Sequence, residues 1–254
     1  QANGAPGTEV TDVSQNNEIS NMNQVLLASN DCDQLSGPGD NLADCSIEAG
    51  NIIDTIAQGN DVSSGDLFTD FFQDNDASFS QFLDISNNCD ESTFVVASEN
   101  NDAVCENSAQ NELGPVSQSN FAQGQFDALI DQDNNAAAAQ NLVADNTCDS
   151  TGTHTAECEN FEAVNDIEGI SQGTQSIGVL DVSSTQVNNA VVDQNNVVLN
   201  DCDEFDLGSN DATCLNFRPE NFVGPITQTS ANNPGDQTLG ATIPQTNDVV
   251  ISQN

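Results

Sequence analysis

The stretch Gln132–Cys148, QDNNAAAAQNLVADNTC, alternates along its whole length between two kinds of residue. Its first, third and every further odd position carries an amide, an aliphatic residue or the final cysteine: Gln132, Asn134, Ala136, Ala138, Gln140, Leu142, Ala144, Asn146 and Cys148. The positions between them include the acids Asp133 and Asp145. Alternate side chains of a β-strand share one face, whereas the faces of a helix recur every three to four residues. The stretch is therefore predicted to be a long β-strand with one amide-rich face and one acidic or polar face.

This pattern recurs four times, and the cysteines mark each copy. They fall in four close pairs: Cys32 and Cys45, Cys89 and Cys105, Cys148 and Cys158, Cys202 and Cys214. Amides precede the first cysteine of each pair at fixed distances of two, eight and sixteen residues: Asn30, Asn87, Asn146 and Asn200; Gln24, Gln81, Gln140 and Gln194; Asn16, Gln73, Gln132 and Gln186. Another glutamine follows each second cysteine: Gln58, Gln118, Gln172 and Gln228. Such a recurrence predicts a tandem repeat protein.

The expected organisation is an N-terminal segment, residues 1–12, followed by one repeat array over residues 13–254. The array divides into copies of about 57 residues, the spacing from Cys32 to Cys89. These copies cover residues 13–70, 71–129, 130–183 and 184–236, with a partial fifth copy at 237–254. Repeats of this kind bury a face only by stacking on their neighbours.

The amide-rich face identifies the expected fold class, which is an all-β protein with a β-solenoid architecture. A buried amide needs hydrogen-bond partners, and stacked repeats supply them because each amide can bond the same amide about 4.8 Å away in the next repeat. The candidate ladder residues are Gln24, Gln81, Gln140, Gln194, Asn30, Asn87, Asn146, Asn200, Gln73, Gln132 and Gln186. Alanines such as Ala136 keep the interior narrow.

Three segments carry a resemblance to a known family. Asn75-x-Ala77-x-x-x-Gln81 and its counterparts, which begin at Asn134 and Asn188, resemble the second half of the curlin repeat. Curlins form amyloid-like adhesive fibres on bacteria, and their inward Gln and Asn residues form ladders. The resemblance implies a fibre-forming function. The chain departs from the family in its longer period, in its cysteine loops and in the first half of the motif.

The composition excludes several functions. The chain has 41 acidic residues against one basic residue, Arg218, and a formal net charge of −40. Binding of nucleic acid or of an anionic membrane surface requires Lys and Arg, so neither is expected. No apolar run of about 18 residues is present, so membrane insertion is not expected. The chain begins at Gln1 without Met, which is typical of a mature form whose leader has been removed.

The close cysteine pairs are interpreted as disulfides formed in an oxidising compartment, which places the protein outside the cell or at its surface. Local pairing is the simplest connectivity. Bonds between cysteines of successive repeats are an open alternative. Zinc binding is the less favoured hypothesis because the CxxC spacing and a nearby histidine are both missing.

No enzyme or specific cofactor is expected. The acid-rich stretches offer only weak calcium candidates, because neither follows the order of an EF-hand loop: Asp131, Asp133, Asp201 and Asp203. The charge favours diffuse binding of calcium or other cations. His154 has no nucleophile partner by motif, and Arg218 is interpreted either as one half of an ion pair or as a surface residue.

Together these features predict a structural subunit of an extracellular filament, which serves as a surface fibre, matrix component or adhesive. The expected partner is a second copy of the chain, added head to tail at the open ends of the solenoid, with a cell-surface anchor as an additional candidate partner. The candidate polymerisation residues lie in the partial fifth copy: Gln245, Asn247 and Gln253. The alternative is an extracellular cation-binding or adhesin module that does not polymerise.

Overall fold

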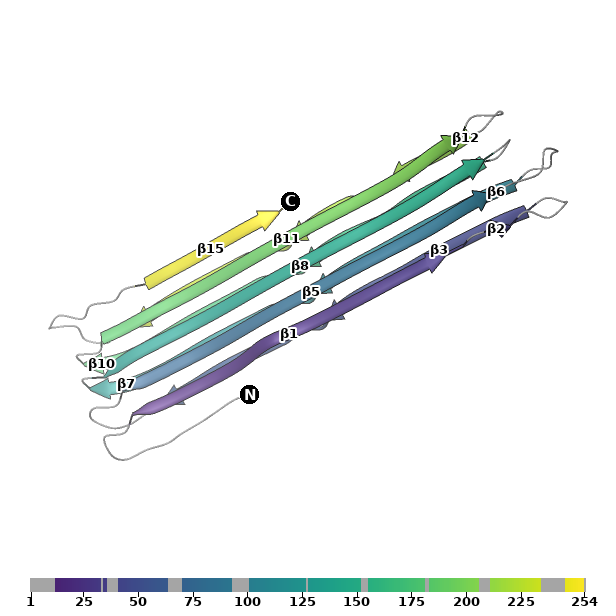
Figure 1. Cartoon of the computed structure of the whole chain (residues 1–254). Coiled ribbons are helices and arrows are strands. Elements are labelled where there is room, and N and C mark those ends of the chain that lie inside the picture. The colour runs from purple at the N-terminus through teal and green to yellow at the C-terminus, as the bar shows by residue number, and fades with distance from the viewer. Residues whose placement is uncertain are drawn as a thin grey trace.

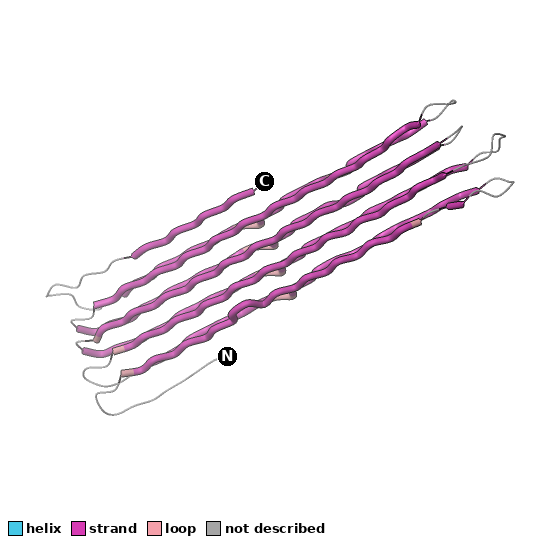
Figure 2. Tube along the Cα trace, in the orientation of Figure 1, coloured by secondary structure: helices cyan, strands magenta, loops and turns pink. Residues whose placement is uncertain are grey.

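The computed structural model describes residues 12–32, 34–35, 41–63, 70–92, 101–126, 128–151, 155–180, 183–205, 211–233 and 245–253. These residues form β-strands joined by short breaks, and none of them is helical. The strands run along one elongated body (Figure 2). The prediction of an all-β protein is therefore confirmed.

The longest strands form one parallel sheet, called sheet A. They are β1 (Val13–Asp31), β5 (Phe71–Ser92), β8 (Leu129–Thr151), β11 (Ser183–Phe205) and β15 (Gln245–Gln253). They lie side by side in chain order (Figure 1), and the short β2 (Gln34–Leu35) pairs with β5. The strands are long because their two-residue alternation continues without a turn-forming residue to interrupt it.

A second layer faces sheet A and contains two parallel sheets. Sheet B consists of β3 (Asn41–Ile53), β6 (Asn101–Leu113), β9 (Thr155–Ile167) and β12 (Asp211–Asn216), with β13 (Pro219–Val223) also paired to β9. Sheet C consists of β4 (Ile56–Ser63), β7 (Val116–Phe126), β10 (Ile170–Leu180) and β14 (Ile226–Asn233). Along the chain, each long strand of sheet A except β15 is followed by sheet B and then by sheet C.

Short breaks separate sheets B and C at residues 54–55, 114–115, 168–169 and 224–225. Two of the breaks are Gly-Pro pairs, and proline ends a run of ladder hydrogen bonds because it has no N–H. The third contains Gly169, whose φ of 154° brings its Cα near the next break; a Cβ there would lie 2.9 Å from the Pro225 carbonyl oxygen. The breaks therefore stack on one another as the strands do.

The strands pair so that like residues meet. In sheet A, Gln73 pairs with Gln132, Asn134 with Asn188, and both β5–β8 and β8–β11 align their cysteines. A shift of one residue would carry every inward side chain to the solvent face, so the buried face fixes this register.

The first repeat departs from the sequence alignment. Strand β1 has a bulge between Ile19 and Met22, where Asn21 has a φ of 57°. The residue that pairs with Gln73 is therefore Gln15, and the sequence-based match of Asn16 with Gln73 is wrong. Counting back from Cys32 placed the match one position late because the bulge inserts one residue.

The interior between the layers contains bands of apolar residues that alternate with bands of amides. One apolar band includes Ala136, Ala138, Leu113 and Ile167, and another includes Leu83, Ile85 and Leu142. Between the two bands lie buried amides such as Gln140, which is 1% exposed. The small alanines bring the layers close, so that amides of one layer can reach backbone carbonyls of the other.

Candidate functional site

Sheet A contains two glutamine ladders, at positions expected from the sequence except for Gln15 in the first repeat. In the first, Gln73 donates to Gln15 at 3.0 Å, Gln132 to Gln73 at 2.8 Å and Gln186 to Gln132 at 3.0 Å. In the second, each side-chain Nε2 again donates to the Oε1 of the preceding repeat: Gln81 to Gln24, Gln140 to Gln81, Gln194 to Gln140 and Gln253 to Gln194. The second N–H of the side-chain amide donates to a backbone carbonyl of the opposite layer, as from Gln140 to the Asp166 carbonyl at 2.9 Å.

An asparagine ladder lies beside the first glutamine ladder. Its members are bonded in sequence by Nδ2–Oδ1 hydrogen bonds of 2.9 Å: Asn17, Asn75, Asn134, Asn188 and Asn247. Facing Asn60 and Asn120 from sheet C join it, with Asn75 donating to Asn120 at 2.8 Å. In the later repeats Thr174 and Ser230 take the place of these two sheet C residues.

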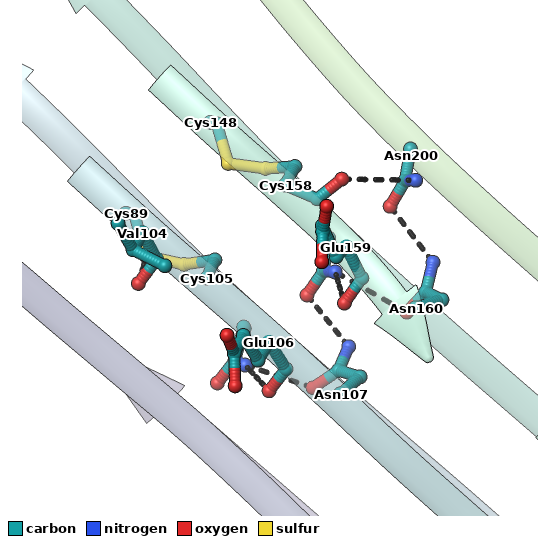
Figure 3. The surroundings of a disulfide bond; sticks show 12 residues. Cys89, Val104, Cys105, Glu106, Asn107, Cys148, Cys158, Glu159, Asn160 and Asn200 are labelled. Atoms are coloured by element: carbon teal, nitrogen blue, oxygen red, sulfur yellow. Dashed lines mark hydrogen bonds between the residues drawn. A yellow bond between two sulfur atoms is a disulfide. The ribbon is translucent and has the colours of Figure 1, made fainter. Parts of the chain in front are cut away.

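The asparagines just before the first cysteines do not bond to one another, contrary to the like-on-like pairing expected from the sequence. Their hydrogen bonds cross between the layers: Asn87 donates to Asn107, Asn107 to Asn146, Asn146 to Asn160 and Asn160 to Asn200. Figure 3 shows part of this zigzag beside the disulfides. The crossing is possible because sheet B offers an asparagine at the same depth. Asn30, in the first repeat, donates instead to the Ser46 carbonyl.

Two further ladders lie in the second layer, and sequence reasoning assigned neither. In sheet C, Gln118 donates to Gln58, Gln172 to Gln118 and Gln228 to Gln172. The recurrence of these glutamines was visible in the sequence, but their role was not. In sheet B, Asn51 donates to Asn111, Asn111 to Asn165 and Asn165 to Asn221. A bulge at Phe161 shifts their distance from the cysteines by one residue, which hides the pattern.

The cysteines form a column that joins sheet A to sheet B at one end of the body. Disulfides link Cys32 to Cys45, Cys89 to Cys105 and Cys148 to Cys158, with Cα–Cα distances of 6.4, 6.4 and 6.3 Å. These distances suit a disulfide. Local pairing is therefore confirmed for these three pairs (Figure 3).

The fourth pair is described only in part. Cys214 is disulfide-bonded, and the side chain of Cys202 lies outside the described residues.

Each of the three described disulfides closes a loop, with a sequence separation of 10 to 16 residues between its cysteines. The closed loop restricts the unfolded chain, which contributes about 3 kcal/mol of stability per bond.

Acids of neighbouring strands meet on the outer face of sheet A. Asp74 and Asp133 pair across β5 and β8, so their carboxylates stack. Burial, and then the negative charges of Asp76 and Asp133, raise the pKa of Asp74 to about 6. Burial also raises the pKa of Asp133. The raised pKa means that Asp74 and Asp133 hold protons more tightly than free aspartates do.

The weak calcium candidates do not converge. Asp131 and Asp201 are exposed, and the side chain of Asp203 lies outside the described residues. Within the described part of the chain, no three carboxylates lie close enough together to hold one ion. The sulfur atoms of Cys45, Cys89 and Cys105 lie within 4.8 Å of one another, but these cysteines are in disulfides and have no free thiol to bind a metal ion.

Of the remaining residues singled out from the sequence, the structure describes Arg218 but not His154. His154 lies outside the described residues. Arg218 is exposed, with a φ of 51°, in the break between β12 and β13. Nearby, Phe161 and Phe217 stack with ring centroids 5.7 Å apart. In the described residues there is no helix that could cross a membrane.

The two ends of the stack display its interior. At one end lie β1, β3 and β4, and at the other lie β15, β12 and β14. Val249 and Ile251 on β15 are 42% and 49% exposed, although their register partners Ala190 and Val192 are fully buried. The ends therefore present the same residue types that the middle of the stack buries.

The chain was compared with known proteins by family, by sequence and by structure. No family model, no curated protein and no solved structure matches it. Its function must therefore be inferred from its own geometry.

Proposed function

We propose that the chain is a β-solenoid of four tandem repeats plus a partial fifth, and that it is a structural subunit of an extracellular filament. Successive long strands pair in register, and the ladders pass through all four repeats. The disulfides support an oxidising environment, which is typical of secreted proteins. The resemblance of the Asn-x-Ala-x-x-x-Gln segments to curlin repeats supports a fibre.

The observation that carries this proposal is the pair of open ends. A parallel sheet edge offers unpaired N–H and C=O groups, and proteins that stay monomeric normally cover such edges. Among the described residues, the edges also expose apolar side chains that the inner strands bury, as at Met22 of β1, which is 37% exposed although its register partner Phe79 is 3% exposed. A second copy of the chain carries the complementary edge, because its first repeat has ladder amides equivalent to those of the other repeats, such as Asn17 and Gln24. Head-to-tail addition therefore extends the ladders that already run through one molecule.

Negative-stain electron microscopy of the purified oxidised chain tests the proposal, at several salt concentrations with and without calcium. We expect long unbranched filaments at ionic strength high enough to screen the charge of −40. Discrete monomers under every condition, even at high protein concentration, would rule the filament out.

A matched pair of variants places the contact. In Gln24→Glu the Oε1 atom still accepts from Gln81, but the Nε2 donor is lost, both at the open edge and to the Ile52 carbonyl. The neighbouring Asn23→Asp adds the same charge at an exposed residue of the outer face. We expect the first variant to lose filaments and the second to keep them. Loss of filaments in both variants would show that charge alone governs assembly.

One feature favours the alternative, a cation-binding or adhesin module that stays monomeric. The bulge at Asn21 distorts the outermost strand β1, and edge bulges discourage pairing with other chains. A chain that remains monomeric while calcium raises its melting temperature would support this alternative.

A further inference from the structure

The amide ladders have a direction. Between the inward asparagines, each Nδ2 donates toward the C-terminal repeats, as from Asn17 to Asn75 and from Asn51 to Asn111. Between the glutamines, each Nε2 donates toward the N-terminal repeats, as from Gln81 to Gln24. The two kinds of ladder therefore end in opposite groups. At the N-terminal end, asparagine ladders terminate in an acceptor and glutamine ladders in a donor; at the C-terminal end the assignment is reversed.

One of these terminal groups is buried and unsatisfied. Asn17 is 6% exposed, and its Oδ1 atom has no hydrogen-bond partner among the described residues. A buried acceptor left unpaired costs roughly 1–3 kcal/mol. In the inner repeats the equivalent oxygen is satisfied, since Asn75 accepts from Asn17 and Asn134 from Asn75. The missing partner is thus an asparagine Nδ2 of a preceding repeat.

Strand β15 and the first half of β1 are two copies of the same strand. Gln245, Asn247 and Gln253 pair with Gln186, Asn188 and Gln194 of β11. Gln15, Asn17 and Gln24 pair with the equivalent residues of β5. The Nδ2 of Asn188, which donates to Asn247 at 2.9 Å, is the donor that a second copy's Asn17 Oδ1 would need. In the same way, the Gln194 Oε1 atom, which accepts from Gln253, is the acceptor that a second copy's Gln24 Nε2 would need.

The three sheets also end at different levels along the stacking direction of the strands. Sheet A is five long strands deep, whereas sheet C is four strands deep and ends at β14, and sheet B ends at β12. If β1 of a second copy stacked on β15, its β4 would lie one strand spacing too far from β14. If its β4 stacked on β14, its β1 would need the position that β15 occupies. A second copy can therefore meet all three sheets at once only when β15 has left β11.

We infer that the edges of β11, β12 and β14 form the docking surface for β1, β3 and β4 of a second copy, and that β15 covers part of this surface as a removable competitor. The inference rests on the proposed head-to-tail function and adds its regulation. In the docked state Asn188 donates to Asn17 of the second copy, and Gln24 of that copy donates to Gln194. The glutamine ladder of sheet C continues in the same way from Gln228 to Gln58. Head-to-head contact is disfavoured because like groups would meet.

The hold of β15 on β11 is weak enough for exchange. Every β15 side chain that the structure describes, from Thr246 to Gln253, is exposed. The strand pairs on one side only, over nine residues of β11, and it contacts sheet C through few bonds, such as Gln228 to the Asp248 carbonyl at 2.9 Å. A second copy replaces these contacts and adds the edges of two more sheets.

Hydrogen exchange of the full-length chain, measured by mass spectrometry before and after assembly, tests this exchange. We expect the amides of residues 245–253 to lose protection in the filament, while those of 13–24 gain it. Gained protection at 245–253 would overturn the inference, because β15 would then be the contact strand itself, and the proposed function would survive. Absence of filaments altogether would instead defeat the proposed function on which the inference rests.

A double variant of the full chain gives an independent check. Val249→Asp with Gln253→Glu places two charges on the inward face of β15, against β11. Val250→Asp with Ser252→Asp places the same two charges on its outward face. Release of β15 should lower the protein concentration needed for assembly by about tenfold or more, as expected for removing a competitor held by a few net hydrogen bonds. No difference between the two double variants, or slower assembly of the first, would overturn the inference.

Discussion

The side chain of Asn134 shows how an amide can be buried without cost in this chain. It accepts from Asn75 at 2.9 Å, donates to Asn188 at 2.9 Å and donates to the Gly173 carbonyl at 3.1 Å. Each amide satisfies its neighbours while it is satisfied itself, so the stability of one repeat depends on the next. Removal of Asn134 would leave the Asn188 Oδ1 atom without its donor, whereas the Asn75 Nδ2 would still donate to Asn120 and to the Ser119 carbonyl.

Replacement of Asn134 with leucine should therefore be costly. We expect a loss of about 1–3 kcal/mol in the free energy of unfolding, from the Asn188 Oδ1 atom that loses its buried donor. Asn135→Ala is the matched control, since Asn135 lies on the outer face and hydrogen-bonds the carboxylates of Asp76 and Asp133 there. Urea denaturation followed by circular dichroism measures both variants. A loss no larger than that of the control would show that the ladder contributes nothing net.

At the scale of the elements, the strands of successive repeats match almost residue for residue, and the exceptions are bulges. The bulge of β1 places two residues opposite Ser78 and holds Asn21 in a left-handed conformation. Such a conformation costs a non-glycine residue about 1–2 kcal/mol. The bulge lies within the part of β1 that β15 resembles, so in the proposed filament it would affect both folding and assembly.

Deletion of Asn21 should restore unbroken pairing between β1 and β5. We expect the free energy of unfolding to rise by about 1 kcal/mol, because the left-handed residue disappears and the ladder closes. Asn21→Gly relieves only the backbone conformation, so it should stabilise less than the deletion. Thermal melts of the three chains give the comparison. Destabilisation by the deletion would mean that the bulge is required by packing.

At the scale of the whole molecule, the charge opposes the stack. Parallel repeats place acids of neighbouring strands side by side, as at Asp74 and Asp133, and no lysine is present to pair with them. The raised pKa of Asp74, about 6, is the measurable consequence of its burial and of the nearby acids. The proposed filament would multiply this repulsion, so ionic strength is expected to control its assembly.

The native state binds the Asp74 proton more tightly than the unfolded state does, since the folded pKa is raised from 3.8 to about 6. The free energy of unfolding should therefore rise as pH falls from 7 through 6, and the gain should be complete only near the unfolded pKa. We expect a higher melting temperature at pH 5 than at pH 7.5. Asp74→Asn should reduce that difference, whereas Asp193→Asn, at an exposed acid of β11, should change it less. A lower melting temperature at pH 5 would contradict the prediction.

The sequence by itself determined the strands, their inward and outward faces and most of the ladder positions. These follow from local rules: alternate residues share a face, and a residue such as Gln140 recurs at a fixed distance from a cysteine. It also indicated local disulfides, because close cysteine pairs in repeats have few other uses.

Only the tertiary structure decided how the faces meet. Three features depend on the spacing between the layers and on bulges: the crossing from Asn87 to Asn107, the sheet B ladder through Asn111 and the one-residue offset at Gln15. Neither the layer spacing nor a bulge leaves a periodic pattern in the sequence. The two directions of the ladders, and the coverage of β11 by β15, are likewise properties of bonded atoms in three dimensions. Periodicity fixes which residues face inward, but which partner each one finds depends on the depth and register of the opposite layer.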